Sequence, residues 1–235
     1  VSNQHCKYLN KKCIKVRKSE PEISIGTCTV EYGKSGENII ICPHRLLEKR
    51  KIFFDCIHLL TMHEPGNEVH VVPEINIPGG SVDYFVASVR DNKIKDFIGV
   101  ELQTLDTTGT VWPERQRFLG NLDIVEEPEE GYGKKPYGMN WKMTAKTILV
   151  QLHHKISTFE HLNKHLVLVL QNQLLDYMKK EFSFSHLSQP AKIGDSMHFH
   201  AYKLDINNNN DYDIKLKDRL STDSTGIATA MGLKA

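Results

Sequence analysis

Side chains that carry oxygen ligands gather in one short part of the chain, residues 74–109. Asp83 stands near the start of one strand-like run, and Glu101 and Gln103 stand two apart in the next. Residues two apart on a strand point to the same face, so Glu101 and Gln103 would project together. If the two runs pair as a hairpin, Asp83 reaches the same end. Two carboxylates and an amide oxygen at one point suit a hard cation such as Mg²⁺.

Acidic residues beside a hairpin are often simply solvated, and this plainer interpretation stays open. Two features argue for a site. Glu101 lies in an otherwise apolar run, where an unpaired charge is costly. A third carboxylate, Glu74, lies in the apolar run 69–77. For this third position Glu68, or neither residue, is the alternative.

Apolar spacing and helix-breaking residues define the elements around these side chains. A helix is predicted to begin near Pro43, because Pro is well placed in a first turn. Strands are predicted at 69–77, 82–90 and 97–105, with a turn at 91–95. Pro73 makes the first strand an edge strand or a bulged one. Gly79 and Gly80 let the backbone bend or approach a ligand closely just before Asp83.

The second half of the chain alternates helical and strand-like patterns. The predicted elements are an amphipathic helix at 140–155, a strand buried on both faces at 166–170, a helix at 174–182 and a less regular strand within 186–204. The polar stretches 126–137 and 207–210 are predicted to be loops, and 221–235 to be peripheral. Together these patterns predict an α/β fold with a mixed central sheet flanked by helices.

Two histidines alternate with an aromatic residue in the last predicted strand. His198 and His200 flank Phe199 and would share one face. A metal pair is one interpretation. No acidic residue accompanies them on that face, so a strand that carries histidines at the surface is the preferred one.

Four of the five cysteines lie within the first 42 residues. They are Cys6, Cys13, Cys28 and Cys42, in a basic segment of low hydrophobicity. The first twenty residues have no apolar signal-peptide region, so disulfides are not expected. The cluster instead suggests a tetrathiolate site for structural Zn or Fe, which would staple a segment too small to fold on a core. Unrelated thiols are the alternative, because no Cys-x-x-Cys pair is present. The fifth, Cys56, is predicted to be a buried residue of the first helix.

Length and composition fit one domain with a small appendage. The chain has 235 residues, 40% hydrophobic and 25% charged, which is ordinary for a globular protein. We therefore divide it into a cysteine segment, 1–42, and a main domain, 43–235. No apolar run approaches the roughly 18 residues that span a membrane. A net charge of +1 does not by itself indicate a nucleic-acid partner, and does not exclude one.

Longer motifs around the acidic residues resemble a known family. The segments GGSVDYFV, GVELQTLDTTGTVWP and NWKMTAKTIL are similar to those of NotI-type restriction endonucleases, over roughly residues 40–170. Asp83 and Glu101-x-Gln103 on adjacent strands resemble a variant of the PD-(D/E)xK nuclease core. Gln103 then stands where that core has a Lys.

The resemblance implies a type II restriction endonuclease that hydrolyses double-stranded DNA with Mg²⁺. Asp83 and Glu101, with Glu74 as the additional acid, would hold the metal. Gln103 would bind metal through its carbonyl oxygen or position water through its amide. Lys146 could supply the missing charge, although an exposed helix lysine is the preferred interpretation.

The resemblance also carries a four-cysteine iron site, a homodimer matched to palindromic DNA, and a cytoplasmic location in a bacterium. No membrane partner is expected. Two other functions stay open: a non-catalytic DNA-binding module on a degenerate nuclease fold, and a repair nuclease with little sequence preference.

Overall fold

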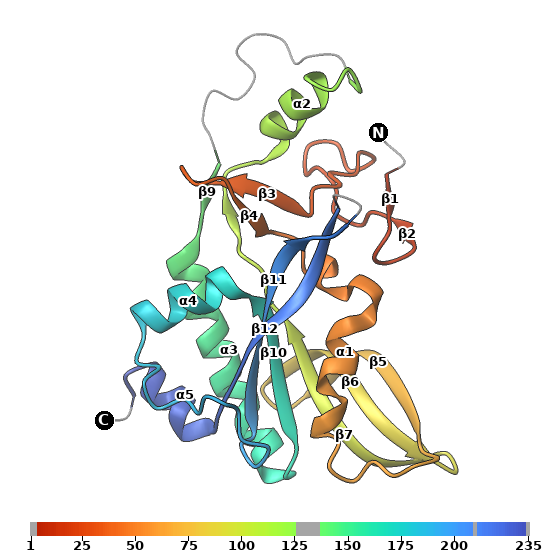
Figure 1. The fold of residues 1–235 in the computed structure, drawn as a ribbon, viewed down its shortest axis with the longest axis vertical. Helices are drawn as coiled ribbons and strands as arrows, with labels where there is room; N and C mark the ends of the chain where they lie inside the picture. The colour runs from red at the N-terminus through yellow and green to blue at the C-terminus, as the bar shows by residue number, and fades with distance from the viewer. Residues whose placement is uncertain (1–3, 126–136, 209–210, 234–235) are drawn as a thin grey trace. The chain divides into compact units, whose positions relative to one another are not determined.

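The structure, a computed structural model, describes residues 4–125, 137–208 and 211–233 (Figure 1). The predicted loop at 126–137 lies outside the described residues except for its last residue, as does the end of the predicted loop at 207–210. The chain forms two compact units, Val1–Arg45 with Leu105–Trp141, and Leu46–Thr104 with Lys142–Ala235. Each unit therefore combines two stretches of the chain, and each is described by itself.

The first unit is built from short strands and one helix. Its strands are β1 (His5–Cys6), β2 (Lys11–Lys12), β3 (Thr29–Tyr32), β4 (Glu37–Ile40), β8 (Thr107–Thr108) and β9 (Gly138–Met139), and its helix is α2 (Trp112–Gly120). They pair as β1 with β2, β3 with β4, and β8 with β9. Arg17 and Arg115 lie over the buried Trp112 ring, 4.6 and 5.0 Å from its centroid. Cation–π contacts thus help to hold this small unit together.

The second unit contains a six-stranded mixed sheet (Figure 1). Its strands are β5 (Glu68–Ile77), β6 (Gly80–Arg90), β7 (Lys93–Leu102), β10 (His165–Gln171), β11 (Met197–Ile206) and β12 (Tyr212–Thr222). Their order is β12-β11-β10-β7-β6-β5. β10 runs parallel to β7 and to β11, and the other pairs are antiparallel. The predicted mixed sheet is confirmed.

Helices cover both faces of this sheet. They are α1 (Lys51–Cys56), α3 (Trp141–His161), α4 (Asn172–Glu181) and α5 (Ser224–Ala230), with 3₁₀ turns at Pro43–Arg50 and Ile57–Leu59. On one face, Phe53 of α1 packs edge-on against Tyr84 at 5.2 Å. On the other, Phe159 of α3 stacks on Phe85 at 6.0 Å. Because Tyr84 and Phe85 are neighbours on β6, α1 and α3 must lie on opposite faces. Within the described residues, no helix is both long and apolar enough to cross a membrane.

The hairpin of β6 and β7 has a tighter turn than the sequence suggested. Asp91 and Asn92 both have positive φ, 51° and 57°, and join Arg90 directly to Lys93. Two positive φ values are the signature of a type I′ turn, which matches the twist of paired strands. The predicted five-residue turn is therefore wrong, and β7 ends at Leu102 rather than at residue 105.

The later elements follow the apolar pattern well. β10 is buried on both faces, as predicted, and α4 covers nearly the predicted range. α3 ends six residues later than predicted because Ile156 and Phe159 continue its buried stripe. The described part of the segment predicted to be peripheral, 221–235, instead completes β12 and forms α5, whose Ile227 is fully buried.

The histidines of β11 are buried rather than at the surface. His198 is 1% exposed and His200 0% exposed. His200 stacks on His58 with ring centroids 6.0 Å apart, and its Nδ1 lies 3.6 Å from the Cys56 Sγ. Burial lowers the pKa of His198 to about 4 and that of His200 to about 3. The predicted surface strand is wrong because the segment around α1 covers this face.

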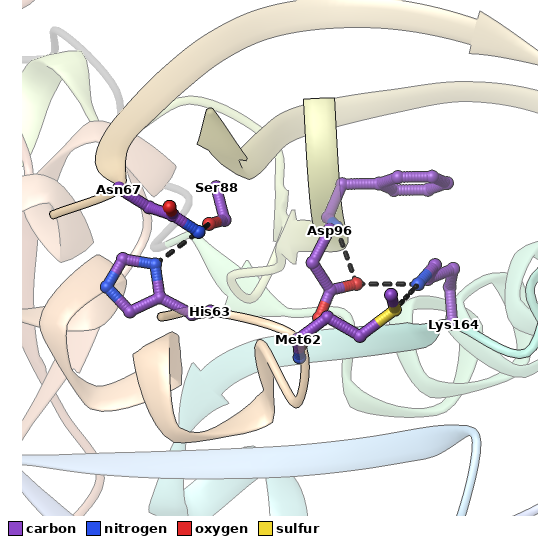
Figure 2. Close-up of polar contacts among 7 residues, drawn as sticks. Met62, His63, Asn67, Ser88, Asp96 and Lys164 are labelled. Carbon is purple, nitrogen blue, oxygen red and sulfur yellow. Dashed lines mark hydrogen bonds and ion pairs between the residues drawn. The ribbon is translucent and has the colours of Figure 1, made fainter. Parts of the chain in front are cut away.

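A polar cluster fixes the closed end of the β6–β7 hairpin. Figure 2 shows its labelled members: Met62, His63, Asn67, Ser88, Asp96 and Lys164. The Asp96 carboxylate accepts the Met62 N–H at 2.9 Å and pairs with the Lys164 ammonium at 2.6 Å. The Ser88 hydroxyl lies 2.9 Å from His63 Nδ1. The loop after α1 and the loop after α3 are thus both attached to the turn end of the hairpin.

The turn between β5 and β6 touches the backbone of α3. Gly79 has φ +95°, and a Cβ there would overlap the carbonyl oxygen of His154. A Cβ on Gly80 would lie 3.3 Å from the Lys155 side chain. The Thr158 hydroxyl donates to the Pro78 carbonyl at 3.0 Å. Only glycine at position 79 permits both this backbone conformation and this contact.

We expect Gly79→Ala to destabilise the protein by about 3 kcal/mol, from positive-φ strain and overpacking together. Gly66→Ala is the matched control, because Gly66 has φ +91° and a Cβ added there would have no atom within 4 Å. It carries only the backbone strain, about 1 kcal/mol. Urea unfolding at equilibrium measures both. Equal losses in the two variants would contradict a close contact between α3 and this turn.

Candidate functional site

The carboxylates predicted on the hairpin meet where its ladder ends. The last pair of β6 and β7 is Tyr84 with Val100, so Asp83 and Glu101 are the next residues across. Asp83 Oδ2 accepts the Leu102 N–H at 2.8 Å. A side chain therefore satisfies the backbone donor at the point where the strand pairing stops. The structure brings Asp83 and Glu101 together on the face that α3 covers.

Glu101 forms a buried ion pair with a lysine of α3. Its Oε1 lies 2.6 Å from Lys155 Nζ, and the two residues are 4% and 7% exposed. Burial raises the pKa of Glu101 to about 7, the hydrogen bond from Lys155 opposes this rise, and the charge of Asp83 adds to it. A carboxylate taken out of water needs such a partner. The charge that looked costly in the apolar run is thus compensated.

Gln103 lies on the same face as Glu101, two residues further along the chain. Its Nε2 donates to Gln151 Oε1 at 3.3 Å, and its backbone N–H donates to the Val169 carbonyl at 2.9 Å. Gln151 and Lys155 are four residues apart on α3, so they project from one side of the helix. The helix therefore supplies one contact to each residue of the Glu-x-Gln motif.

Glu74 lies opposite Asp83 on the edge strand β5. The pairs on either side, Pro73 with Tyr84 and Ile75 with Val82, place these two acids across from one another. Glu74 has φ +51°, which is uncommon for a residue other than Gly, Asn or Asp.

The charges of both acids, Asp83 and Glu74, affect the pKa of the Tyr84 phenol. Burial raises its pKa, and the charges of Asp83 and then Glu74 add to the rise. The alternative acid, Glu68, pairs across from Val89 at the other end of the hairpin and lies 2.7 Å from His70. Glu74, and not Glu68, lies beside Asp83.

The register lines up one carboxylate from each of β5, β6 and β7: Glu74, Asp83 and Glu101. Oxygen ligands of this kind suit Mg²⁺, which keeps several waters when it binds few carboxylates. No group of three or more His, Cys, Asp or Glu side chains already has a metal-holding arrangement within the described residues. Glu74, Asp83 and Glu101 are the residues that could hold a cation here, and the Lys155 ammonium already contacts Glu101.

Lys155 is the site residue that sequence reasoning missed. Lys146, the lysine considered for this role, is exposed near the start of α3. The signal for Lys155 was present, because it falls on the helical stripe of Ile148, Leu152 and Phe159. A lysine on an apolar stripe needs an acidic partner. Because the predicted helix ended at residue 155, Lys155 was not assigned to either the buried or the exposed face of the helix.

The four clustered cysteines lie at the ends of two hairpins in the first unit. Cys6 is the last residue of β1 and Cys13 follows β2, while Cys28 precedes β3 and Cys42 follows β4. All four are free thiols. Hydrogen bonding to Cys28 lowers the pKa of Cys42 to about 6, and the same bond, burial and the neighbouring thiols raise the pKa of Cys28. Folding thus gathers thiols that have no compact spacing in the sequence.

A cavity of about 240 Å³ opens beside three of these thiols, those of Cys6, Cys13 and Cys28. Its lining residues are Gln4, His5, Cys6, Lys7, Tyr8, Cys13, Gly26 and Cys28. Four thiolates form a ligand set that suits Zn²⁺ or iron. The donor chemistry and the mutual proximity of the thiols fit such a metal, while the bond geometry of a bound metal is not preformed among the described residues.

The burial of Glu101 generates a prediction about cation binding. We expect the affinity for Ca²⁺, a non-reactive probe, to fall about tenfold per pH unit below about pH 7, because protons compete for the Glu101 carboxylate. Above that pH the affinity should level off. Isothermal calorimetry between about pH 5.5 and about pH 8.5 measures this, with Glu101→Gln as the variant that should lose the dependence. A midpoint near 4.5, the ordinary value for Glu, would contradict the role of Glu101 as a ligand.

Comparison with known proteins does not assign a family. No protein-family model matches this sequence. A search among curated proteins finds no match either. The functional assignment of this chain therefore depends on its own residues and on their geometry.

Proposed function

We propose that this protein is a type II restriction endonuclease, which hydrolyses phosphodiester bonds of double-stranded DNA with Mg²⁺. The observation that carries the proposal is the meeting of Asp83 and Glu101 at the open end of the β6–β7 ladder. Gln103 lies on the same face as Glu101. This arrangement supports the similarity of the motifs to the PD-(D/E)xK core of NotI-type enzymes.

Asp83 and Glu101, with Glu74 as the additional acid, would hold the Mg²⁺. The bound ion would lower the pKa of a water and stabilise charge on the phosphate and the leaving 3′ oxygen. Glu101 has to be ionised to act as a ligand, so its raised pKa limits binding at acidic pH. Asp83 is held in place by the Leu102 N–H.

Gln103 cannot act as a base or carry charge. Because its amide already donates to Gln151, its carbonyl oxygen is the group better placed to face a cation. This supports the metal-binding role for Gln103 over the water-positioning one.

Cleavage of both strands of a palindromic site is most simply achieved by a homodimer. Arg, Lys, Asn and Gln side chains that reach base edges would supply the sequence readout. A cytoplasmic location in a bacterium belongs to the same proposal.

Cys6, Cys13, Cys28 and Cys42 would hold one structural Fe or Zn ion in the first unit. The support is the interaction of these thiols across two short hairpins. The hairpins have strands of only two and four residues, too short to be stable alone. A tetrathiolate metal would add the missing cross-link.

The first test of the function is cleavage of phage and plasmid DNA, with Mg²⁺ or with EDTA. We expect discrete fragments in Mg²⁺ only. Asp83→Ala and Glu101→Ala should each slow cleavage by at least about 10²-fold, because each removes a charge that holds the metal. Glu74→Ala should have a smaller effect. Glu68→Ala, an acid on the same strand at the far end of the hairpin, is the control and should cleave at nearly the wild-type rate.

Each other outcome points elsewhere. Cleavage that survives both Asp83→Ala and Glu101→Ala contradicts the catalytic assignment. A smear in place of fragments indicates a nuclease with little sequence preference. Binding in a gel shift without any cleavage, on DNAs of high complexity, indicates a DNA-binding module.

The second test concerns the cysteines. Protein purified without added metal should contain about one equivalent of Fe or Zn by elemental analysis. Cys28→Ser should lose that metal and lower the melting temperature. Cys56→Ser is the matched control, because Cys56 is a buried cysteine of the other unit and should leave the metal content unchanged. Less than about half an equivalent in the folded wild type, with four reactive thiols, would rule out the tetrathiolate site.

A further inference from the structure

We propose that Lys155 of α3 is the positively charged catalytic residue of this site, and that its ammonium and the divalent cation share Glu101. In the protein alone the ammonium neutralises Glu101; with the cation bound, it turns to the negative charge of the scissile phosphate. This inference rests on the proposed nuclease function and adds a residue that the strand motif lacks. Lys155 acts through its charge, so no proton transfer is assigned to it.

The first support is the placement of the ammonium. Lys155 Nζ lies 2.6 Å from Glu101 Oε1, and Glu101 is the residue across from Asp83. The lysine is only 7% exposed, so its charge acts where water screens it little. A positive group in such a place can stabilise developing negative charge far better than a surface lysine.

The second support is that the fold keeps a place for this side chain. Gly80 leaves the room in which the Lys155 stem lies, since a Cβ there would come within 3.3 Å of its Cε. Gly79 lets the turn approach the helix backbone at His154, one residue earlier. One helical turn before Lys155, Gln151 holds the amide of Gln103. The same face of α3 therefore meets both residues of the Glu-x-Gln motif.

The third support is electrostatic. A metal ion and an ammonium group repel each other, and both are attracted to the same Glu101 carboxylate. A cation that binds Glu101 therefore weakens the ion pair to Lys155. The lysine stem is flexible, so the ammonium can leave Glu101 while the helix stays in place. When substrate is bound, the freed ammonium would contact the scissile phosphate, which lies next to the metal.

The experiment compares wild type, Lys155→Met and Lys146→Met by two readouts. Met keeps most of the buried stem and removes the charge; Lys146 is an exposed lysine of the same helix and serves as the control. Calorimetry at about pH 8.5, where Glu101 is ionised in the wild type, measures Ca²⁺ affinity without DNA. Single-turnover cleavage in saturating Mg²⁺ measures the chemical step.

We expect Lys155→Met to bind Ca²⁺ at least about tenfold more tightly than wild type and to cleave at least about 10²-fold more slowly. Lys146→Met should match the wild type in Ca²⁺ affinity. A merely structural ion pair would not produce tighter cation binding together with slower chemistry. Unchanged Ca²⁺ affinity in Lys155→Met overturns the sharing of Glu101. Cleavage within about threefold of wild type overturns the catalytic role.

Circular dichroism would reveal whether Lys155→Met is folded. If it is not, a further variant tests the proposal. Lys155→Arg keeps the ion pair but replaces the compact ammonium with a planar group. Because it keeps the positive charge, it should keep the wild-type Ca²⁺ affinity and cleave within about tenfold of the wild-type rate. A loss of about 10²-fold or more in correctly folded Lys155→Arg would contradict a role that depends on the charge.

Failure of the nuclease function gives a different pattern. If the wild type cleaves no DNA, the proposed function is wrong, and calorimetry alone decides whether Lys155 and a cation share Glu101. If Asp83→Asn is inactive while Lys155→Met cleaves normally, the nuclease function stands and the role of Lys155 is wrong.

Discussion

The buried ion pair between Glu101 and Lys155 is the interaction on which the second unit depends. Strand alternation places Glu101 on the face that α3 covers, so its charge is removed from water and needs a partner. Lys155 supplies it only if α3 has one particular rotation and comes close to the turn at Gly79. At the other end of β7, the buried Asp96 pairs with the half-buried Lys164, which follows α3. The two pairs thus attach α3 and the loop after it to two points along β7.

The first unit solves a different physical problem, because its strands are too short to build a core. Its paired thiols and the two guanidinium groups over Trp112 are local contacts between small elements. Hairpins bring cysteines together that are seven and fourteen residues apart in sequence, at positions 6, 13, 28 and 42. A compact cysteine motif is not needed to bring thiols together when the backbone of each hairpin already does so. Spacing in the sequence is therefore a weak guide to a thiolate cluster built on hairpins.

The parts of the fold that the sequence predicted are those in which one strand or helix carries its own pattern. The continuous apolar run of β10 and the alternation around Glu101 are local signals, and both predictions were right in type. Other failures came from contacts between elements. His198 and His200 are buried because the segment around α1 covers them, and the lysine on the stripe of α3 was missed because its partner lies on β7. The choice of Glu74 over Glu68 depended on strand register, which composition does not encode.

The site combines features that stability alone would not select. Glu101 is kept in a place where its pKa rises to about 7, and Glu74 adopts a left-handed backbone on an exposed edge strand. Both cost free energy in the protein alone. A divalent cation would reverse the first of these costs, because it stabilises the ionised carboxylate and lowers its pKa. In the proposed nuclease, the same binding would free the ammonium group that otherwise neutralises Glu101. Metal binding and the appearance of a free positive charge would then be coupled through one carboxylate.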